Sequence, residues 1–450
     1  MEQTAAMVST RTTHVRYIIV LMLFAASTFS YGDRVVLSIA ATDISRDLHL
    51  DALRLGYLFS AFSWAYAAAQ LPAGSLLDRF GSRRVYGISI VCWSCCAFLS
   101  GFAGYAPAAV AFYILLALRL LSGLAQSPVF PGNGRIVAAW FPAAERGRAS
   151  AIFNSSQYFS LVIFAPVMGW IAHRLGWKQC FWFAGLTALT LGVLWFQAVH
   201  DVKAHPRISP VEIEWIERGG GLASLDAGGR AGTNTLTWPV VRWLLSSRML
   251  IGIYLAQYCI TTLTWFFLTW FPIYLSQSRR LSIVAVGFLA AVPALCGFAG
   301  GILGGVASDR LLKAGHSLTF ARKAPIVAGM LLAMTMIACN YVNSSLAVML
   351  LMSLAFFGKG FGALGWTVIS DTSPKSLVGV NGGLFNLIGN LAGITTPIII
   401  GAIIAHTGTF HYALLYVAAT AMLAIVAYLP IVGEIRRLES PRDLIAGSNA

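Results

Sequence analysis

The chain has 450 residues, of which 58% are hydrophobic and only 11% are charged, whereas an ordinary soluble domain has about 25% charged residues. So much apolar surface excludes a soluble globular protein and predicts a chain whose solvent is a lipid bilayer. The net charge of +14 could indicate nucleic-acid binding. Most of the Lys and Arg residues, however, fall on one predicted side of the membrane, as the positive-inside rule requires, so we expect no nucleic-acid partner.

Twelve apolar runs follow one another along the chain, each long enough to cross about 30 Å of hydrocarbon as a helix. They lie near residues 17–41, 54–77, 85–104, 108–134, 149–172, 179–199, 250–275, 283–307, 324–342, 345–369, 379–404 and 411–432. The segment before the first run is short and polar, and the run is too long for a signal-peptide core, so we expect a retained first span.

A polar segment of mixed charge separates the sixth run from the seventh. It contains Ile213 and Ile216 among glutamates, which indicates a short surface helix. We therefore predict an all-α membrane protein with 12 transmembrane helices in two six-helix bundles. Residues 1–200 form the first bundle, 201–248 a cytoplasmic linker, and 249–450 the second bundle with a cytoplasmic tail, so both termini lie in the cytoplasm.

An internal repeat supports this division. The motif Gly74-x-x-x-Asp78-Arg79 recurs as Gly305-x-x-x-Asp309-Arg310. At nearly the same offset, Pro142, Gly147, Phe153 and Asn154 recur as Pro374, Gly379, Phe385 and Asn386. Matches that fall in corresponding loops and helices indicate two similar halves.

The motifs resemble those of a known family. The loop from Gly74 to Arg84 is similar to the signature between helices 2 and 3 of major facilitator transporters, and the run from Gly358 to Pro397 resembles their anion:cation symporter branch. Within that branch, four segments are similar to bacterial glucarate/galactarate permeases: YGDRVVLSIAATDISRDL, FSAFSWAYAAAQLP, FPGNGRIVAAWFP and ERGRASAIFNSSQYF. Galactonate and hexuronate permeases fit less closely. The resemblance implies the major facilitator fold, two pseudo-symmetric halves, and a substrate site between them at mid-depth.

Charged side chains inside the apolar runs indicate transport. Asp33 and Arg34 lie in the first run and Arg119 in the fourth, where each costs at least about 2.5–3.5 kcal/mol and marks an ion or substrate path. Guanidinium groups suit bidentate binding of carboxylates. We predict that Arg34 and Arg119 hold the substrate carboxylates and that Asp33 binds the coupled proton. The alternative is that Arg34 only neutralises Asp33.

Amide and phenol side chains are suited to the hydroxyl groups of a sugar acid. The candidates are Tyr31, Tyr66, Gln157, Asn386 and Asn390. The resemblance implies that Tyr31, Asp33, Arg34, Arg119, Gln157 and Asn386 lie at the family's site. Asn386 and Asn390 could instead serve as hydrogen-bonding contacts between helices. Lys359 in the tenth run either snorkels or pairs within the bundle, which we favour, or contacts an anionic substrate.

One position departs from the family pattern. Related permeases usually carry Leu-Ala-Glu-Ala-Pro, whereas this chain has Leu124-Ala125-Gln126-Ser127-Pro128. The resemblance implies a proton-coupling role for that glutamate, and glutamine cannot titrate. Coupling then rests on Asp33 or uses another ion, while the shape and hydrogen bonding of Gln126 resemble those of a protonated glutamate.

A third set of residues lies at the cytoplasmic helix ends, where the resemblance implies contacts that latch the outward-open state. The set is Gly74, Asp78, Arg79, Gly81, Arg83, Arg84, Asp309 and Arg310. A purely topogenic role for the arginines is the alternative.

Several other motifs carry no chemistry. Gly360-x-Gly362-x-x-Gly365 lies inside an apolar run rather than after a strand, so close helix packing explains it better than a dinucleotide. Cys92-x-x-Cys95 also lies within a span, no phosphate-binding loop occurs, and no residues have metal-ligand spacing. We expect no cofactor, no metal and no enzymatic activity.

We predict a monomeric secondary transporter of the bacterial inner membrane. It imports a sugar-acid anion of the glucarate/galactarate type with a coupled cation, H⁺, by alternating access. A carrier of hexuronate, galactonate or an aromatic acid, or one running as a facilitator, is the alternative within this class. From another class, the chain could be a sugar-acid sensor that does not transport.

Overall fold

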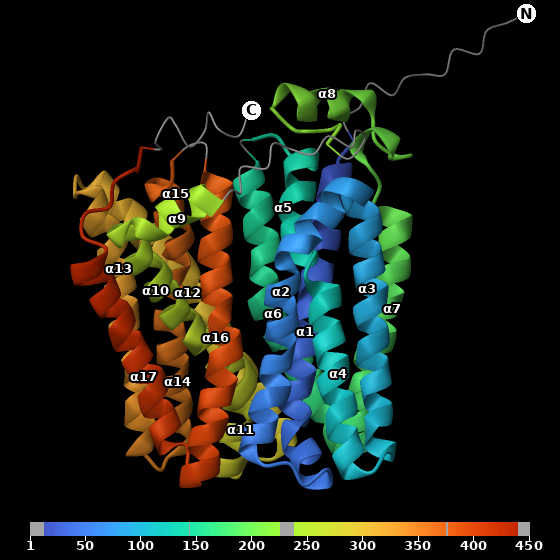
Figure 1. The fold of residues 1–450 in the computed structure, drawn as a ribbon, viewed down its shortest axis with the longest axis vertical. Helices are drawn as coiled ribbons and strands as arrows, with labels where there is room; N and C mark the ends of the chain where they lie inside the picture. Colours follow the sequence, from blue (N-terminus) through green and yellow to red (C-terminus); the bar gives the residue numbers. More distant parts are fainter. Residues whose placement is uncertain (1–12, 144, 226–237, 375–376, 440–450) are drawn as a thin grey trace, which may run out of the picture.

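The computed structural model describes residues 13–143, 145–225, 238–374 and 377–439. Residues 226–237 of the predicted linker and the two chain ends lie outside this part. All regular elements of the described chain are helices, and the long ones run roughly parallel to one another (Figure 1). Helices α8 (Pro210–Arg218) and α9 (Trp238–Ser246) lie at one end of this array, which we call the linker end.

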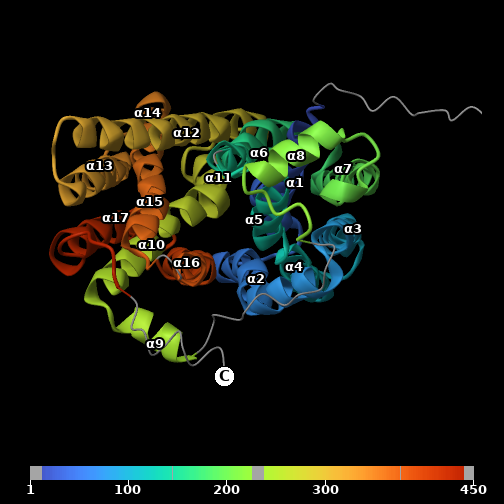
Figure 2. The same cartoon turned by 90° about the horizontal axis from the view of Figure 1, so that it is seen from above.

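The long helices form two groups, which Figure 2 shows side by side from above. The first group is α1 (Val15–Asp47), α2 (Ala52–Phe80), α3 (Ser82–Ser100), α4 (Ala108–Gln126), α5 (Val129–Trp140), α6 (Arg146–Leu175) and α7 (Trp177–Ala198). The second is α10 (Arg248–Trp265), α11 (Phe271–Ile273), α12 (Ile283–Lys313), α13 (Leu318–Ala333), α14 (Ser345–Gly360), α15 (Leu364–Thr372), α16 (Val378–Thr407) and α17 (His411–Val426). We call them the first and second halves.

Eleven helical stretches of the described chain are long and apolar enough to cross a membrane. The helix that this criterion omits is α2, which has 29 residues and packs between α4 and α16. Counted with α2, the stretches correspond to the twelve predicted spans, and the predicted fold class is confirmed. The fourth span is broken into α4 and α5 at Pro128, because proline has no N–H for the helix ladder and its ring clashes with the preceding turn.

The linker holds the predicted surface helix, α8, and also α9, which we did not predict. Ser209 caps α8 by accepting the N–H of Glu212. The Glu212 side chain then reaches α1, where it accepts the N–H of Val15 and of Arg16. Residues 201–225 are thereby attached to the first half. The division of the chain into separate domains at residues 200 and 248 stays a prediction.

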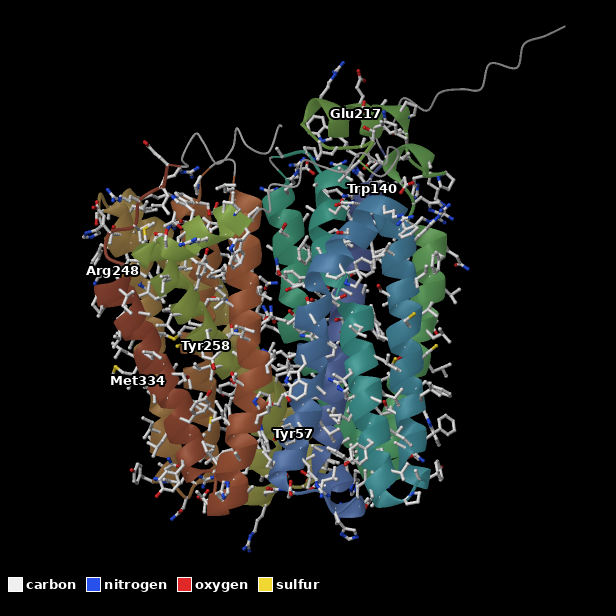
Figure 3. All side chains as sticks on the ribbon, viewed as in Figure 1. Tyr57, Trp140, Glu217, Arg248, Tyr258 and Met334 are labelled. Carbon is white, nitrogen blue, oxygen red and sulfur yellow. The ribbon has the colours of Figure 1, made fainter. Side chains whose placement is uncertain are left out.

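The two halves touch directly at the end opposite the linker. Ser38 donates to the carbonyl of Thr269 at 2.8 Å, and the hydroxyls of Thr42 and Ser276 lie 2.9 Å apart. In Figure 3, Tyr57 lies toward this end, while Trp140 and Glu217 lie toward the linker end. The halves are therefore closed against each other at the opposite end.

Glycines make this contact close. A Cβ on Gly56 of α2 would lie 2.6 Å from the carbonyl oxygen of Pro397 on α16, and one on Gly287 of α12 would lie 2.5 Å from that of Ala165 on α6. Gly401 and Gly169 face Ala52 and Ile283 in the same way. Four backbone approaches, two at each interface, thus join α2 to α16 and α6 to α12.

Candidate functional site

A cavity of about 900 Å³ lies between the two halves. Its lining residues run from Ser27 to Arg34 on α1 and from Gly147 to Tyr158 on α6. Both helices begin at the linker end, so the cavity extends from that end to about the middle of the array. The second half contributes residues of α10, α14, α15 and α16, among them Ser370 near the linker end of α15.

Arg34 lies at the inner part of this cavity, and its guanidinium group is surrounded by aromatic side chains. Its guanidinium carbon is 4.7 Å from the ring centre of Tyr31, 4.4 Å from that of Phe62, and 5.8 Å from those of Tyr66 and Trp265. Its Nε has no hydrogen-bond partner among the described residues, and no carboxylate there lies within 4 Å. The sequence alternative, in which Arg34 neutralises Asp33, is not the arrangement seen.

Asp33 pairs instead with Arg119. Its Oδ2 accepts from Nη1 of Arg119 at 2.9 Å, from Nε2 of Gln126 at 3.1 Å and from the Ser122 hydroxyl at 3.2 Å. Ser30 donates to Oε1 of Gln126, which fixes the amide so that its N–H₂ faces Asp33. Asp33 and Arg119 are 5% and 4% exposed and lie beside the cavity, outside its lining.

This arrangement differs from the predicted pairing of the two arginines. Arg119 is the member of the predicted substrate set that does not line the cavity, and its Nη1 donates to Asp33 instead. Both cations contact the ring of Phe62, whose centre is 4.4 Å from the guanidinium carbon of Arg34 and 5.3 Å from that of Arg119. The two arginines therefore share one aromatic neighbour.

The other predicted substrate residues share the cavity. They are Tyr31, Tyr66, Gln157, Asn386 and Asn390. Asn390 donates to the backbone and side-chain oxygens of Asn386, at 2.9 and 3.1 Å, and the two lie one turn apart on α16. These contacts join residues of one helix, so they are not the contacts between helices that we gave as the alternative.

Our sequence reasoning missed the polar face that α10 presents to the cavity. Gln257, Thr261 and Thr264 all line it, and Gln257 donates to the Thr261 hydroxyl at 3.3 Å. The signal was available, because polar residues spaced by four and then three positions in an apolar run share one helix face. With Asn386, they supply hydroxyl and amide groups from the second half.

Charge in the cavity has one sign. Among the described residues, its lining holds two side chains that carry a positive charge, Arg34 and Lys359, and no Asp or Glu. A buried cation without a partner is destabilising. The cavity is therefore suited to an anion that also offers hydroxyl groups.

The predicted gating residues all lie at the linker end. Asp78 forms an ion pair with Arg135 of α5, while Asp309 lies 3.6 Å from Arg322 of α13, which also bonds Asp371 at 2.9 Å. Each of these pairs stays within one half. Gly74 lies in the last third of α2 with open space around it, and Arg84 and Arg310 are exposed.

The turn between α2 and α3 holds the remaining gating residues. Gly81 has φ +80°, a conformation that favours glycine. Arg79 lies over the ring of Phe80. Arg83 donates to the carbonyl of Phe196 at 2.8 Å and lies 3.2 Å from Nε2 of His200. Burial and the neighbouring Arg83 lower the pKa of His200, so this contact involves a neutral imidazole.

Comparison with known proteins identifies a family and several relatives. Residues 23–397 match the Major Facilitator Superfamily. The chain is 55% identical to the probable galactarate/D-glucarate transporter GudP of Bacillus subtilis, over 95% of this chain and 94% of that one. It is 51% identical to GudP of Escherichia coli over 98% of both chains, and 36% identical to an E. coli D-galactonate transporter over 94% of this chain and 97% of that one.

Solved structures give the same fold. The crystal structure of a D-xylose–proton symporter superposes with a TM-score of 0.71 at 15% identity, covering 93% of this chain and 98% of that one. A bacterial homologue of the lysosomal transporter Spinster, in an inward-facing conformation, gives 0.68 at 16% identity, covering 93% and 96%. At these identities the similarity is one of fold.

Proposed function

Because this chain belongs to the Major Facilitator Superfamily, a family of membrane transporters and not of enzymes, we propose that it carries a sugar-acid anion of the glucarate/galactarate type across a bacterial inner membrane. One observation carries this proposal: a cavity between the halves holds two cations, no described carboxylate and a set of amide and hydroxyl groups. A carboxylate would bind Arg34, and the hydroxyls would bond Gln157, Gln257 and Asn386. The relatives named as galactarate/D-glucarate transporters support this substrate class.

Transport in this proposal is import by alternating access. We assign the linker end to the cytoplasm because Lys and Arg concentrate in its loops. The cavity reaches that end, and the opposite end is closed by the contacts of Ser38 and Thr42 with the second half. The arrangement corresponds to a state that would release substrate inward, with both termini in the cytoplasm. The protein would work as a monomer, since each chain holds a complete cavity.

A proton on Asp33 would couple the substrate to the membrane gradient. Protonation removes the charge that holds Arg119, and the freed guanidinium lies against Phe62, which also contacts Arg34. The carrier would then bind substrate and reorient, and loss of the proton toward the cytoplasm would restore the ion pair and release the anion. One charge moved through 100 mV supplies about 2.3 kcal/mol, enough for concentrative uptake.

The gating residues would act at the same end. In the closed-inward state, Asp78 and Asp309 would exchange their present partners, Arg135 and Arg322, for contacts between the halves. The open space around Gly74 leaves room for that approach.

Counterflow of labelled D-glucarate in proteoliposomes tests the proposed function. We expect exchange with D-glucarate and galactarate, and net accumulation when the outside is made acidic. Purified protein that binds glucarate without exchanging it would be a sensor, and protein that exchanges it without responding to a pH gradient would be a facilitator. The facilitator is the second candidate. Gln126 cannot titrate, so Asp33 is the one group among the described residues at this ion pair that could carry the coupled proton.

A further inference from the structure

Lys359 occupies a second cationic position in the cavity, on the half opposite Arg34. It is 8% exposed, and its Nζ lies 5.5 Å from the ring centre of Tyr158 and 5.3 Å from that of Phe356. Tyr158 belongs to α6 of the first half, so the ammonium group reaches the boundary between the halves. Aromatic ring faces attract cations, so the two rings help to hold the ammonium group in place.

The backbone at Lys359 is fixed by close packing. Its neighbours Gly358 and Gly360 lie so near the backbones of α13, at Gly329, and of α12, at Gly297, that neither has room for a side chain. Three helices therefore meet at this residue and direct its side chain to the cavity.

The other buried cations differ from Lys359 in their partners. Arg16, Arg119 and Arg322 each have a carboxylate within 4 Å, and Lys323 donates to the backbone carbonyl of Leu429. Over the described residues, neither Lys359 nor Arg34 has a carboxylate that close, and both line the same cavity. Two unneutralised charges on opposite walls fit a ligand that carries a negative charge at each end.

We propose that Lys359 binds the second carboxylate of the substrate and selects sugar dicarboxylates over sugar monocarboxylates. Arg34 holds one end of the six-carbon chain and Lys359 the other, while the hydroxyl groups between them meet the amides and threonines of the walls. This inference rests on the proposed function and replaces Arg119 with Lys359 as the partner of Arg34. A dianion that bridges the two halves also favours the states in which they enclose it.

D-glucarate and D-gluconate test the assignment, because they differ only in having a carboxylate or a hydroxymethyl group at the sixth carbon. Binding of each to purified protein is measured by titration calorimetry, alongside exchange of labelled glucarate in proteoliposomes. We expect Lys359→Met to weaken glucarate binding at least about tenfold, as loss of one partner of a buried charge pair does. Gluconate binding should change less than about threefold. Lys359→Arg should retain the preference for the dicarboxylate.

Lys323→Met is the matched control. Lys323 is a lysine of the second half that is also 8% exposed, but it donates to the carbonyl of Leu429 and does not line the cavity. This variant should bind both acids as the unmodified protein does. If Lys359→Met does not fold, as judged by its elution profile, Lys359→Gln takes its place.

The outcomes separate the two proposals. If the unmodified protein exchanges glucarate, and Lys359→Met or Lys359→Gln keeps its preference for glucarate over gluconate, the assignment of Lys359 is wrong and the proposed function stands. If the unmodified protein neither binds nor exchanges a sugar acid, both are wrong. A loss of preference limited to the Lys359→Met or Lys359→Gln variant supports the assignment.

Discussion

Asp33 and Arg119 form a buried ion pair that lies beside the cavity, whereas the neighbouring Arg34 faces into it. Successive residues of a helix point about 100° apart, so two adjacent charges can serve different partners. This division leaves Arg34 available to an anion and gives Asp33 a partner of its own. The two proposed functions of the site, binding and coupling, thus start from adjacent positions in the sequence.

At this scale we predict the effect of Asp33→Asn. An amide cannot gain or lose a proton in the physiological range, so accumulation driven by a pH gradient should fall to the level of exchange alone, while glucarate counterflow continues. The measurement is uptake into proteoliposomes with and without an imposed gradient. Asp43→Asn is the control, since Asp43 lies on the same helix and pairs with the exposed Arg46. Gradient-driven accumulation that persists in Asp33→Asn would disprove the coupling role.

At the scale of elements, the linker helix α8 completes the start of α1. Glu212 is fully buried, and it accepts two backbone N–H groups at the N-terminus of α1 and the Arg16 guanidinium at 3.0 Å. The first N–H groups of a helix have no partner within it, and a carboxylate there is stabilised by the helix dipole. The linker is therefore part of the first half at this point.

We predict that Glu212→Ala destabilises the protein. Removing one partner of a buried ion pair leaves Arg16 with only Glu145 and costs about 3–5 kcal/mol. The melting temperature of the purified protein should fall clearly, as measured by tryptophan fluorescence. Glu214→Ala, two residues away, removes an exposed pair with Arg218 and should shift it little. Equal shifts in the two variants would contradict this account.

At the scale of the whole molecule, the glycine contacts allow the two halves to pack closely at the opposite end. Gly56 and Gly287 occupy corresponding positions of α2 and α12, and each admits the backbone of a helix from the other half. A side chain at either position cannot fit while the opposite end is closed. It can fit only if the halves separate there.

We predict that Gly56→Leu combined with Gly287→Leu shifts the protein toward the state open at the opposite end. The reporter is a disulfide between Thr42→Cys and Ser276→Cys, whose hydroxyls lie 2.9 Å apart in the present state. Cross-linking should be fast in the parent protein and at least about tenfold slower with the two leucines, which corresponds to about 1.4 kcal/mol. Gly134→Leu with Gly383→Leu, at glycines with open space around them, should leave the rate unchanged. If both double leucine variants slowed cross-linking equally, the effect would not come from side chains that separate the halves at the glycine contacts.

Much of the fold was predictable from the sequence. Hydropathy marks each span by its own residues, and the internal repeat shows that the two halves correspond. The predicted membership of the major facilitator family and the resemblance to glucarate/galactarate permeases are confirmed. The break at Pro128 was also readable in principle. Helix α9 was missed because we grouped the largely apolar Trp238–Ser246 with the polar linker around it.

The functional site was predictable by residue type more than by geometry. Charge inside apolar runs identified Asp33, Arg34 and Arg119. Side-chain type, together with the family resemblance, gave Tyr31, Tyr66, Gln157, Asn386 and Asn390 as polar candidates, and six of these eight residues line one cavity. Which cation faces that cavity depends on helix rotation and on contacts between distant segments. The sequence determined that this protein must place a few charges in a bilayer, because hydrophobicity is a property of each segment by itself. Only the tertiary structure decided that Arg119 neutralises Asp33. It also decided that Arg34 and Lys359 line the cavity from opposite halves, each without a carboxylate partner among the described residues. The physical reason is that ion pairing depends on distances between helices, which no single helix sets.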